Sequence, residues 1–297
     1  MNLSRFSAIF WRALAAGVFS SANVVMASPI PLPSGPIYIQ YNNAEQFSVS
    51  NSIATTTAAG AAVTEGNWGI VQVSSMQKGT VLAPTGSDIQ GGGTTVFADG
   101  LSGGQITGIF WGVQIFPGSF GTRATSGFMD LYWQDATTVN VGAELASGAN
   151  LVKRTDQNHY TGFTTGTFLL RLAFAGGCDP TFAFFTICTA VDPTTTDGTA
   201  KSYQNVDLSA GGLWASALDT EFFTLNASNG PLTPPADVRT DSNFSRNGGG
   251  AWDVGGTDII GLRSNDPVRA YVPEPDTLAL LGIALLALVG LRRKSAA

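Results

Sequence analysis

The sequence from residue 105 to residue 116 reads Gln105-Ile106-Thr107-Gly108-Ile109-Phe110-Trp111-Gly112-Val113-Gln114-Ile115-Phe116. Such a mostly apolar run, rich in β-branched and aromatic residues, is typical of a strand that is covered on both faces. The runs 127–134 and 167–174 have the same character. We therefore expect three central strands of a sandwich or barrel, and we predict an all-β fold with a single β-sandwich, jelly-roll-like or otherwise antiparallel.

Shorter strand candidates flank these runs and are separated by turn residues such as Gly91-Gly92-Gly93. They are the β-branched and aromatic segments 37–41, 68–73 and 94–97. Two segments, 142–152 and 207–218, could hold one helical turn or more. The low-complexity segment 53–64 is expected to be a mobile loop or a weak edge strand, 192–199 a surface loop, and 265–269 a connection to the C-terminal segment.

The N-terminal segment has the three parts of a secretory signal peptide. Arg5 and Arg12 supply a positive region, residues 13–25 form a small apolar region, and Val25-Met26-Ala27 offers small residues at a cleavage site. We expect the Sec translocon and signal peptidase to act on this segment, with cleavage between Ala27 and Ser28. A retained N-terminal anchor is the alternative, although the segment is short for spanning.

The C-terminal segment predicts a membrane helix. Residues 276–291 are apolar after Asp276 and precede Arg292-Arg293-Lys294. At a rise of 1.5 Å per residue they reach roughly 24 Å, which approaches the roughly 30 Å hydrocarbon core once the flanking cations extend to the headgroups. The cations should stay cytoplasmic, which places the rest of the chain outside. A buried core helix is the alternative.

The same segment resembles the PEP-CTERM sorting signal of Gram-negative bacteria. The resemblance covers residues 272–297 and rests on Val272-Pro273-Glu274-Pro275, the apolar helix, and Arg292-Arg293-Lys294. It implies processing near Pro273, Glu274 and Pro275 by an exosortase, a membrane-embedded cysteine protease of organisms that make exopolysaccharide. These residues would then be a substrate and not an active site. The chain divides into a signal peptide (1–27), an exported β-rich domain (28–271) and a sorting signal (272–297).

The charge of the exported domain argues against nucleic acid as a partner. Of the 15 basic and 21 acidic residues of the chain, 10 and 19 lie within residues 28–271, for a net charge of about −9. An acidic, charge-poor surface suits a protein that stays soluble among hydrated polysaccharide or binds divalent cations, and it is equally common among inert secreted proteins.

Cys178 and Cys188 are the only cysteines of the sequence, and in an oxidising compartment we expect them to form a disulfide. Closing so short a loop stabilises the fold by roughly 2–3 kcal/mol. The bridge is expected to staple a hairpin, or alternatively to present Phe182, Phe184 and Phe185 as a binding surface. Two cysteines and His159 do not complete a zinc site of the usual four ligands.

The sequence carries no catalytic motif, so we expect no enzymatic activity and no cofactor. His159 is the only histidine and lies in a polar stretch that is typical of a solvated turn. Two carboxylate pairs, Asp130 with Asp135 and Asp219 with Glu221, would suit glycoside hydrolysis if they faced each other across a cleft. The second pair shares one face if it lies on a strand.

Calcium is a weak candidate ligand, and ordinary turn chemistry is the main reading of the same residues. Asp192 with Asp197, and Asp253 with Asp258, supply hard oxygens on glycine-rich turns. The second pair faintly resembles one nonapeptide of an RTX repeat, but it lacks tandem copies.

These observations predict a protein sorted by an exosortase, with a structural or adhesive role in biofilm, floc or exopolysaccharide association. It would pass through the inner membrane as a single-pass intermediate, with its C-terminus cytoplasmic, and finally reside at the cell surface or outside the cell. The first alternative is a carbohydrate-binding module with exposed aromatic residues, and the second is a glycoside hydrolase. The aromatic candidates are Trp111, Trp133, Trp214 and Trp252.

Overall fold

The computed structural model describes residues 30–118, 121–135, 139–148, 152–247 and 249–274. The predicted signal peptide 1–27, its cleavage site at Ala27 and Ser28, and the predicted membrane helix 276–291 lie outside these residues, as do Pro275 and Arg292-Arg293-Lys294. None of the described helices has the length and apolar character needed to cross a membrane.

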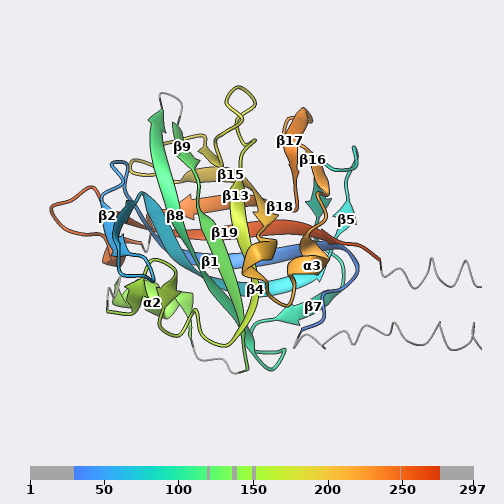
Figure 1. Ribbon diagram of the computed structural model, residues 1–297, viewed down its shortest axis with the longest axis horizontal. Helices are drawn as coiled ribbons and strands as arrows, with labels where there is room; N and C mark the ends of the chain where they lie inside the picture. The colour runs from blue at the N-terminus through green and yellow to red at the C-terminus, as the bar shows by residue number, and fades with distance from the viewer. Residues whose placement is uncertain (1–29, 119–120, 136–138, 149–151, 248, 275–297) are drawn as a thin grey trace, which may run out of the picture. The chain divides into compact units, whose positions relative to one another are not determined.

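The structure is built almost entirely from strands, which make up 52% of the described residues, whereas helix makes up 7%. The all-β prediction is therefore confirmed (Figure 1). The strands are β1 (Gly35–Phe47), β2 (Ile53–Thr56), β3 (Ala62–Glu65), β4 (Asn67–Lys78), β5 (Thr80–Val81), β6 (Ile89–Gln90), β7 (Thr95–Ala98), β8 (Gln105–Gly118), β9 (Gly121–Thr125), β10 (Phe128–Gln134), β11 (Arg154–Asp156), β12 (His159–Tyr160), β13 (Thr167–Ala175), β14 (Ile187–Thr189), β15 (Gly198–Val206), β16 (Phe223–Leu225), β17 (Pro231–Ala236), β18 (Val238–Ser245) and β19 (Ile260–Val272). The helices are α2 (Val141–Ser147), α3 (Ala215–Leu218) and the 3-10 turns η1 (Leu208–Ala210) and η2 (Gly250–Trp252).

Eight antiparallel strands close into a barrel, in the order β1, β4, β8, β10, β13, β15, β18, β19. The pairings β4 with β8 and β13 with β15 join segments far apart in sequence and complete the circle. Strands β9 and β14 add a second connection between β8 and β15. The predicted β-sandwich is wrong in this respect, because β1 and β19 have hydrogen-bonded neighbours on both edges and leave no sheet edge there.

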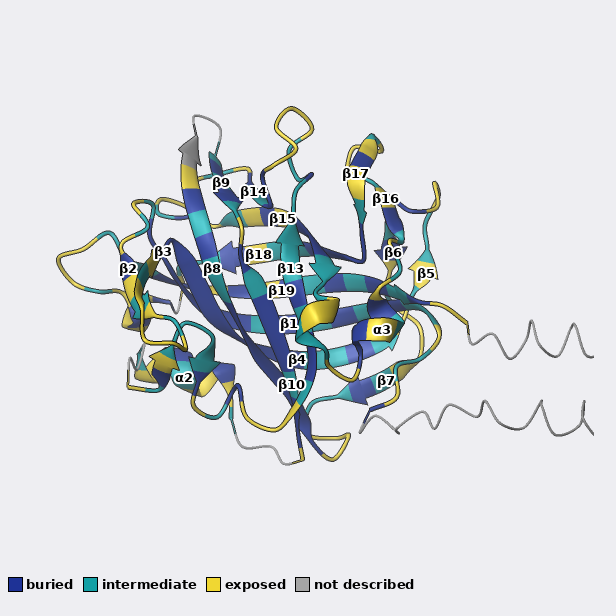
Figure 2. Cartoon of the chain, in the orientation of Figure 1, coloured by how far each residue is buried: buried dark blue, intermediate teal, exposed yellow. Residues whose placement is uncertain are grey.

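The strands alternate between an interior face and an outer face. In β1 the odd-numbered residues Asn43 and Glu45 face the interior, whereas Ala44 packs outside against α2. The outer cluster under α2 consists of Ala44, Ile53, Trp68, Ile70, Ile109, Val141, Leu145, Tyr160, Phe163 and Trp252. A second outer cluster beside the β5–β6 and β16–β17 hairpins consists of Ile89, Tyr203, Phe223, Leu232 and Ala236. Figure 2 shows the buried barrel strands and the more exposed peripheral hairpins.

Gly112 adjusts the alternation within β8. Its φ of 72° lies in the left-handed region, and the register against β4 shifts at this point, from Phe110 opposite Gly69 to Val113 opposite Asn67. As a result Phe110 and Val113, three residues apart, both line the barrel interior.

All six predicted strands correspond to strands of the structure, and the described residues of 142–152 and 207–218 form short helices. The segment 53–64 forms the β2–β3 hairpin, which corresponds to the edge-strand alternative. The expected connection at 265–269 is wrong, because these residues lie in the middle of β19 and pair with β1 and β18. The polar composition of this segment is typical of a linker, but in β19 its side chains alternate between the barrel interior and the outer face.

Candidate functional site

A polar cleft of ≈ 320 Å³ lies on the outer face of the barrel, beside the short β5–β6 hairpin. Its volume falls within the range of pockets that hold small ligands. Strands β1, β4 and β19 form its floor, and the hairpin and the residues after it form its wall. The lining residues are Tyr38, Gln77, Leu82, Asp88, Ile89, Gln90, Gly91 and Arg269.

Strand alternation positions the two central side chains of the cleft. Ile37 and Ile39 are buried on the interior face of β1, so Tyr38 between them faces outward. Arg269 lies directly opposite Tyr38 in the β1–β19 pair. Its guanidinium carbon is 5.6 Å from the centre of the Tyr38 ring, which is a cation–π geometry.

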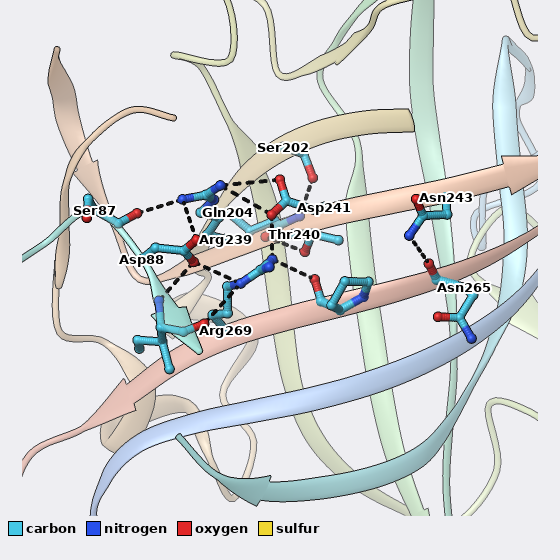
Figure 3. A network of polar contacts seen from close by, with 12 residues as sticks. Ser87, Asp88, Ser202, Gln204, Arg239, Thr240, Asp241, Asn243, Asn265 and Arg269 are labelled. Atoms are coloured by element: carbon cyan, nitrogen blue, oxygen red, sulfur yellow. Dashed lines mark hydrogen bonds and ion pairs between the residues drawn. The ribbon is translucent and has the colours of Figure 1, made fainter. Parts of the chain in front are cut away.

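A closed ring of four ion pairs includes the cleft residues Asp88 and Arg269 (Figure 3). The Arg269 guanidinium contacts Asp88 at 2.9 Å and Asp241 at 2.6 Å. The Arg239 guanidinium contacts the same two carboxylates, at 3.3 Å for Asp88 and 3.2 Å for Asp241. Two positive and two negative charges are thus combined in a neutral cluster, with the arginine side chains only 9% and 11% exposed.

This network ties the β5–β6 hairpin to the barrel. Arg239 donates a hydrogen bond to the carbonyl of Ser87 at 2.7 Å, and Arg269 donates one to the carbonyl of Ile89 at 3.2 Å. Asp88 in turn accepts one from the backbone N–H of Ile89 at 2.8 Å. The orientation of Arg269 is therefore fixed before any ligand binds. This reduces the conformational entropy that the side chain loses on binding.

The open side of the cleft offers hydrogen-bonding groups around an aromatic ring. The Gln77 side-chain oxygen accepts a hydrogen bond from the Gly92 N–H at 3.2 Å, and Gln90 is exposed. A side chain at Gly91 would begin 2.8 Å from the Tyr38 ring, so glycine at this position leaves room beside the ring. An apolar ring face surrounded by amide and charged groups can hold a ligand that has both hydroxyl groups and an apolar face.

The four tryptophans proposed for carbohydrate binding do not form an exposed row. Trp133, Trp214 and Trp252 are buried, with exposures of 6%, 2% and 0%. Trp111 is partly buried, with its ring 4.9 Å from that of Phe128. The expectation that these four rings form an exposed binding surface is therefore wrong, because the indoles are packed against the rest of the protein.

The two carboxylate pairs proposed for hydrolysis lie in different surroundings. Asp130 is fully buried and forms two hydrogen bonds of 2.7 Å with the Arg171 guanidinium, whereas Asp135 is exposed. Asp219 and Glu221 are exposed and precede β16 in a non-strand segment, where Glu221 has a φ of 50°. They therefore do not share a strand face, contrary to that expectation.

The calcium candidates form turns and loop contacts. Asp192 accepts hydrogen bonds from the backbone and side chain of Thr194, at 2.9 and 2.7 Å. Asp197 accepts one from the Arg246 backbone N–H at 3.0 Å, and Asp253 pairs with the same residue's guanidinium at 3.1 Å.

Asp258 accepts four hydrogen bonds, from the Ser48, Ser50 and Ser52 hydroxyls and the Ser50 N–H. Burial works to raise its pKa, but these hydrogen bonds outweigh it and hold the pKa well below its usual range. Among the described residues, no group of three or more His, Cys, Asp or Glu side chains is arranged to hold a metal ion.

The predicted disulfide between Cys178 and Cys188 is present. Of the phenylalanines that it encloses, Phe182 and Phe184 are exposed and Phe185 is buried. His159 lies in β12, with its Nδ1 2.7 Å from the hydroxyl of Thr164.

The sequence gives no sign that the cleft residues belong together, because they come from distant segments. Tyr38 lies in a predicted strand, but only the structure shows that the isoleucines on either side of it are buried and that its own side chain faces outward. Arg269 lies in the segment 265–269, for which the sequence predicts a connection. The approach of Asp88 to both arginines depends on the fold of the β5–β6 hairpin, and no local signal in the sequence indicates it.

The C-terminal motif begins where the barrel ends. Val272 is the last residue of β19, is 8% exposed and pairs with Gly35 of β1. Pro273 and Glu274 follow and are exposed. The motif is thus attached to the barrel without an intervening linker.

Comparison with known proteins identifies this end of the chain. Residues 272–294 match the family model of the PEP-CTERM protein-sorting motif. No curated protein and no solved structure matches the chain significantly. The protein thus carries a PEP-CTERM protein-sorting motif, which indicates an exported protein that an exosortase sorts to the cell surface.

Proposed function

We propose that this protein is a non-enzymatic surface or matrix protein that associates with exopolysaccharide through the Tyr38 cleft. Its role would be structural or adhesive, in biofilm or floc. The observation that carries the proposal is the cleft of ≈ 320 Å³ in which Tyr38 lies among Gln77, Gln90 and Arg269. A sugar ring places its C–H face on an aromatic ring and its hydroxyl groups on flanking amide and charged groups.

The carboxylates of the cleft region favour binding over catalysis. Asp88 and Asp241 each contact both Arg239 and Arg269, so their negative charges are used to hold the hairpin in place. A glycosidase needs one carboxyl group that can deliver a proton and a second that acts as nucleophile or base. For this reason we assign adhesion, and not glycoside hydrolysis, to the cleft.

We further propose that sorting passes through a single-pass inner-membrane stage with a cytoplasmic C-terminus. The apolar sequence from Leu278 to Leu291 and the cations that follow it support this stage. Because Val272 is paired within the barrel, exosortase would act close to a folded domain.

Binding of the full chain to exopolysaccharide from the producing cells tests the cleft. We expect Tyr38→Ala and Gln77→Ala to weaken retention on immobilised polysaccharide at least about tenfold, a loss of roughly 1.4 kcal/mol. The matched control is Tyr132→Ala, because Tyr132 is also a partly buried strand tyrosine but packs against Phe168 outside the cleft. Equal retention of all variants and the wild type would refute the cleft as the binding site.

A further inference from the structure

The barrel interior contains a second cavity, of ≈ 80 Å³, whose properties differ from those of the outer cleft. Much of its wall is apolar, with Phe110, Met129 and Phe174 among the lining residues. Polar side chains from the interior faces of β1, β18 and β19 gather along one part of the wall. They are Asn43, Glu45, Ser242, Ser264 and Asp266.

Strand register brings these five side chains together. Asn43 lies opposite Ser264 in the β1–β19 pair, and Glu45 is two residues further along the same face. Asp266 accepts hydrogen bonds from the Asn43 amide and the Ser242 hydroxyl, and another from the Ser264 hydroxyl at 3.4 Å. Three neighbouring strands therefore direct oxygen atoms at one region of the cavity.

Two carboxyl groups share this region without a basic partner. Glu45 is 8% exposed and Asp266 is 4% exposed, and none of the ion pairs among the described residues involves either one. The Ser264 hydroxyl donates a hydrogen bond to Asp266 at 3.4 Å, and the Asn67 amide donates one to Glu45 at 3.0 Å, so these hydrogen-bond donors are neutral groups. A pair of buried carboxylates is costly unless a proton or a cation neutralises it.

Asn43 supplies an independent indication of a ligand. Asn43 is only 4% exposed, and its amide nitrogen donates a hydrogen bond to Asp266. The amide oxygen Oδ1 is buried and has no hydrogen-bond partner among the residues that the structure describes. A buried acceptor without a donor costs about 1–3 kcal/mol, a loss that a coordinated cation would remove.

We propose that Asn43, Glu45, Ser242, Ser264 and Asp266 bind a hard divalent cation of the calcium class inside the barrel. The donors are carboxylate, amide and hydroxyl oxygens, which are the ligands that such cations prefer. Two carboxylates also match a charge of +2. The cavity leaves room for water to complete the coordination.

The other charged and titratable groups around the cavity are consistent with a cation there. Arg123 lines the cavity, but its guanidinium contacts the Asp179 carboxylate at 3.0 Å. Tyr41 lies opposite Asp266 in the β1–β19 pair. Burial, and secondarily the nearby Asp266, raise its pKa, so its hydroxyl stays neutral at physiological pH.

Calcium titration of the full chain tests the proposal. The chain, purified in mild detergent and freed of metal by a chelator, is titrated with Ca²⁺ at pH 7.5 by isothermal calorimetry. We expect one ion per chain, because the five donor side chains gather at one region of a single cavity. Mg²⁺ should bind more weakly, since it demands a smaller and more regular site.

Substitutions then locate the ion. Asp266→Asn and Glu45→Gln should each weaken Ca²⁺ binding at least about tenfold, whereas Asp192→Asn, in an exposed turn, should leave it unchanged. Circular dichroism shows whether the two interior variants fold. If they do not, the wild-type titration still decides, because absence of Ca²⁺ binding would overturn the proposal. Binding that survives both interior substitutions, or that Asp192→Asn abolishes, would also overturn it.

Discussion

Asp88 is the residue that joins the hairpin wall of the cleft to its floor, since it contacts both Arg239 and Arg269. Asp88→Asn keeps the shape of the side chain but removes its charge, which leaves two mostly buried arginines with Asp241 as their common carboxylate. We expect the free energy of unfolding to fall by about 1–3 kcal/mol, measured by urea denaturation. Asp192→Asn should stay within about 0.5 kcal/mol of the wild type. Equal stability of the two variants would contradict the role of the network.

Asp266 should make stability depend on pH. Burial, only partly offset by the hydrogen bond from Ser242, raises its pKa from 3.8 to about 8. The folded state therefore keeps a proton that the unfolded state loses, so the stability contribution is complete below about pH 4 and is lost as the pH rises towards 8. The slope is at most about 1.4 kcal/mol per pH unit.

The check is urea denaturation of the wild type and Asp266→Asn at several pH values between 5 and 8, with chelator present. The variant should gain stability relative to the wild type as the pH rises, because its amide does not ionise. Burial raises the pKa of Glu45 as well. The stability of the variant should therefore still depend on pH, but less steeply than that of the wild type. Parallel curves for the two proteins would show that Asp266 does not titrate in this range.

Single residues could be predicted from the sequence where chemistry is local. The number and spacing of Cys178 and Cys188 predict a disulfide, and the structure contains that bridge. The prediction of exposed tryptophans is wrong, because residue type alone does not separate an exposed ring from a packed one. Asn43 and Asp266 are 223 positions apart, and only the β1–β19 register brings them together.

At the level of elements, the disulfide loop links β14 to the end of β13. Cys188 lies in β14, and Asp179 next to Cys178 contacts Arg123 of β9 at 3.0 Å. Replacing both cysteines by serine should lower the free energy of unfolding by about 2–3 kcal/mol, because the unfolded chain regains freedom. Guanidinium denaturation of oxidised wild type and the double variant measures the change. A midpoint unaltered by the substitution would contradict the expected stabilisation.

Strands were easier to predict than the segments between them. The apolar run from Gln105 to Phe116 lies within β8, and its β-branched composition is sufficient to indicate a strand. The segment from Asn265 to Arg269 was missed because its polar residues resemble a linker. In β19 these side chains alternate between the interior, where Asp266 lies, and the outer face, where Arg269 lies.

At the scale of the whole molecule, β19 is central to the barrel although it immediately precedes the sorting motif. It pairs with β1 along its whole length and also with β18. A chain ending at Ser264 loses eight residues of this strand, Asn265–Val272, and should not fold. A chain ending at Val272 should keep the fold. Protease resistance and circular dichroism distinguish the two, and a folded chain ending at Ser264 would contradict this topology.

Barrel closure is the part of the fold that the sequence could not reveal. The same strands, turns and alternation suit a sandwich or a barrel, and the choice depends on whether β4 meets β8 and β13 meets β15. Those pairings are set by register and bulges, such as the one at Gly112. The sorting motif, in contrast, is a contiguous stretch whose order of residues is sufficient to identify it.

Fractionation of cells that produce either the full chain or the chain ending at Val272 tests the sorting account most directly. Both chains keep all of β19, so a difference between them reports on sorting and not on folding. We expect the full chain to reach the cell surface or the matrix, and we expect the shortened chain not to remain there. An identical distribution of the two chains, or full-length chain with both ends uncut in the cytosol, would contradict it.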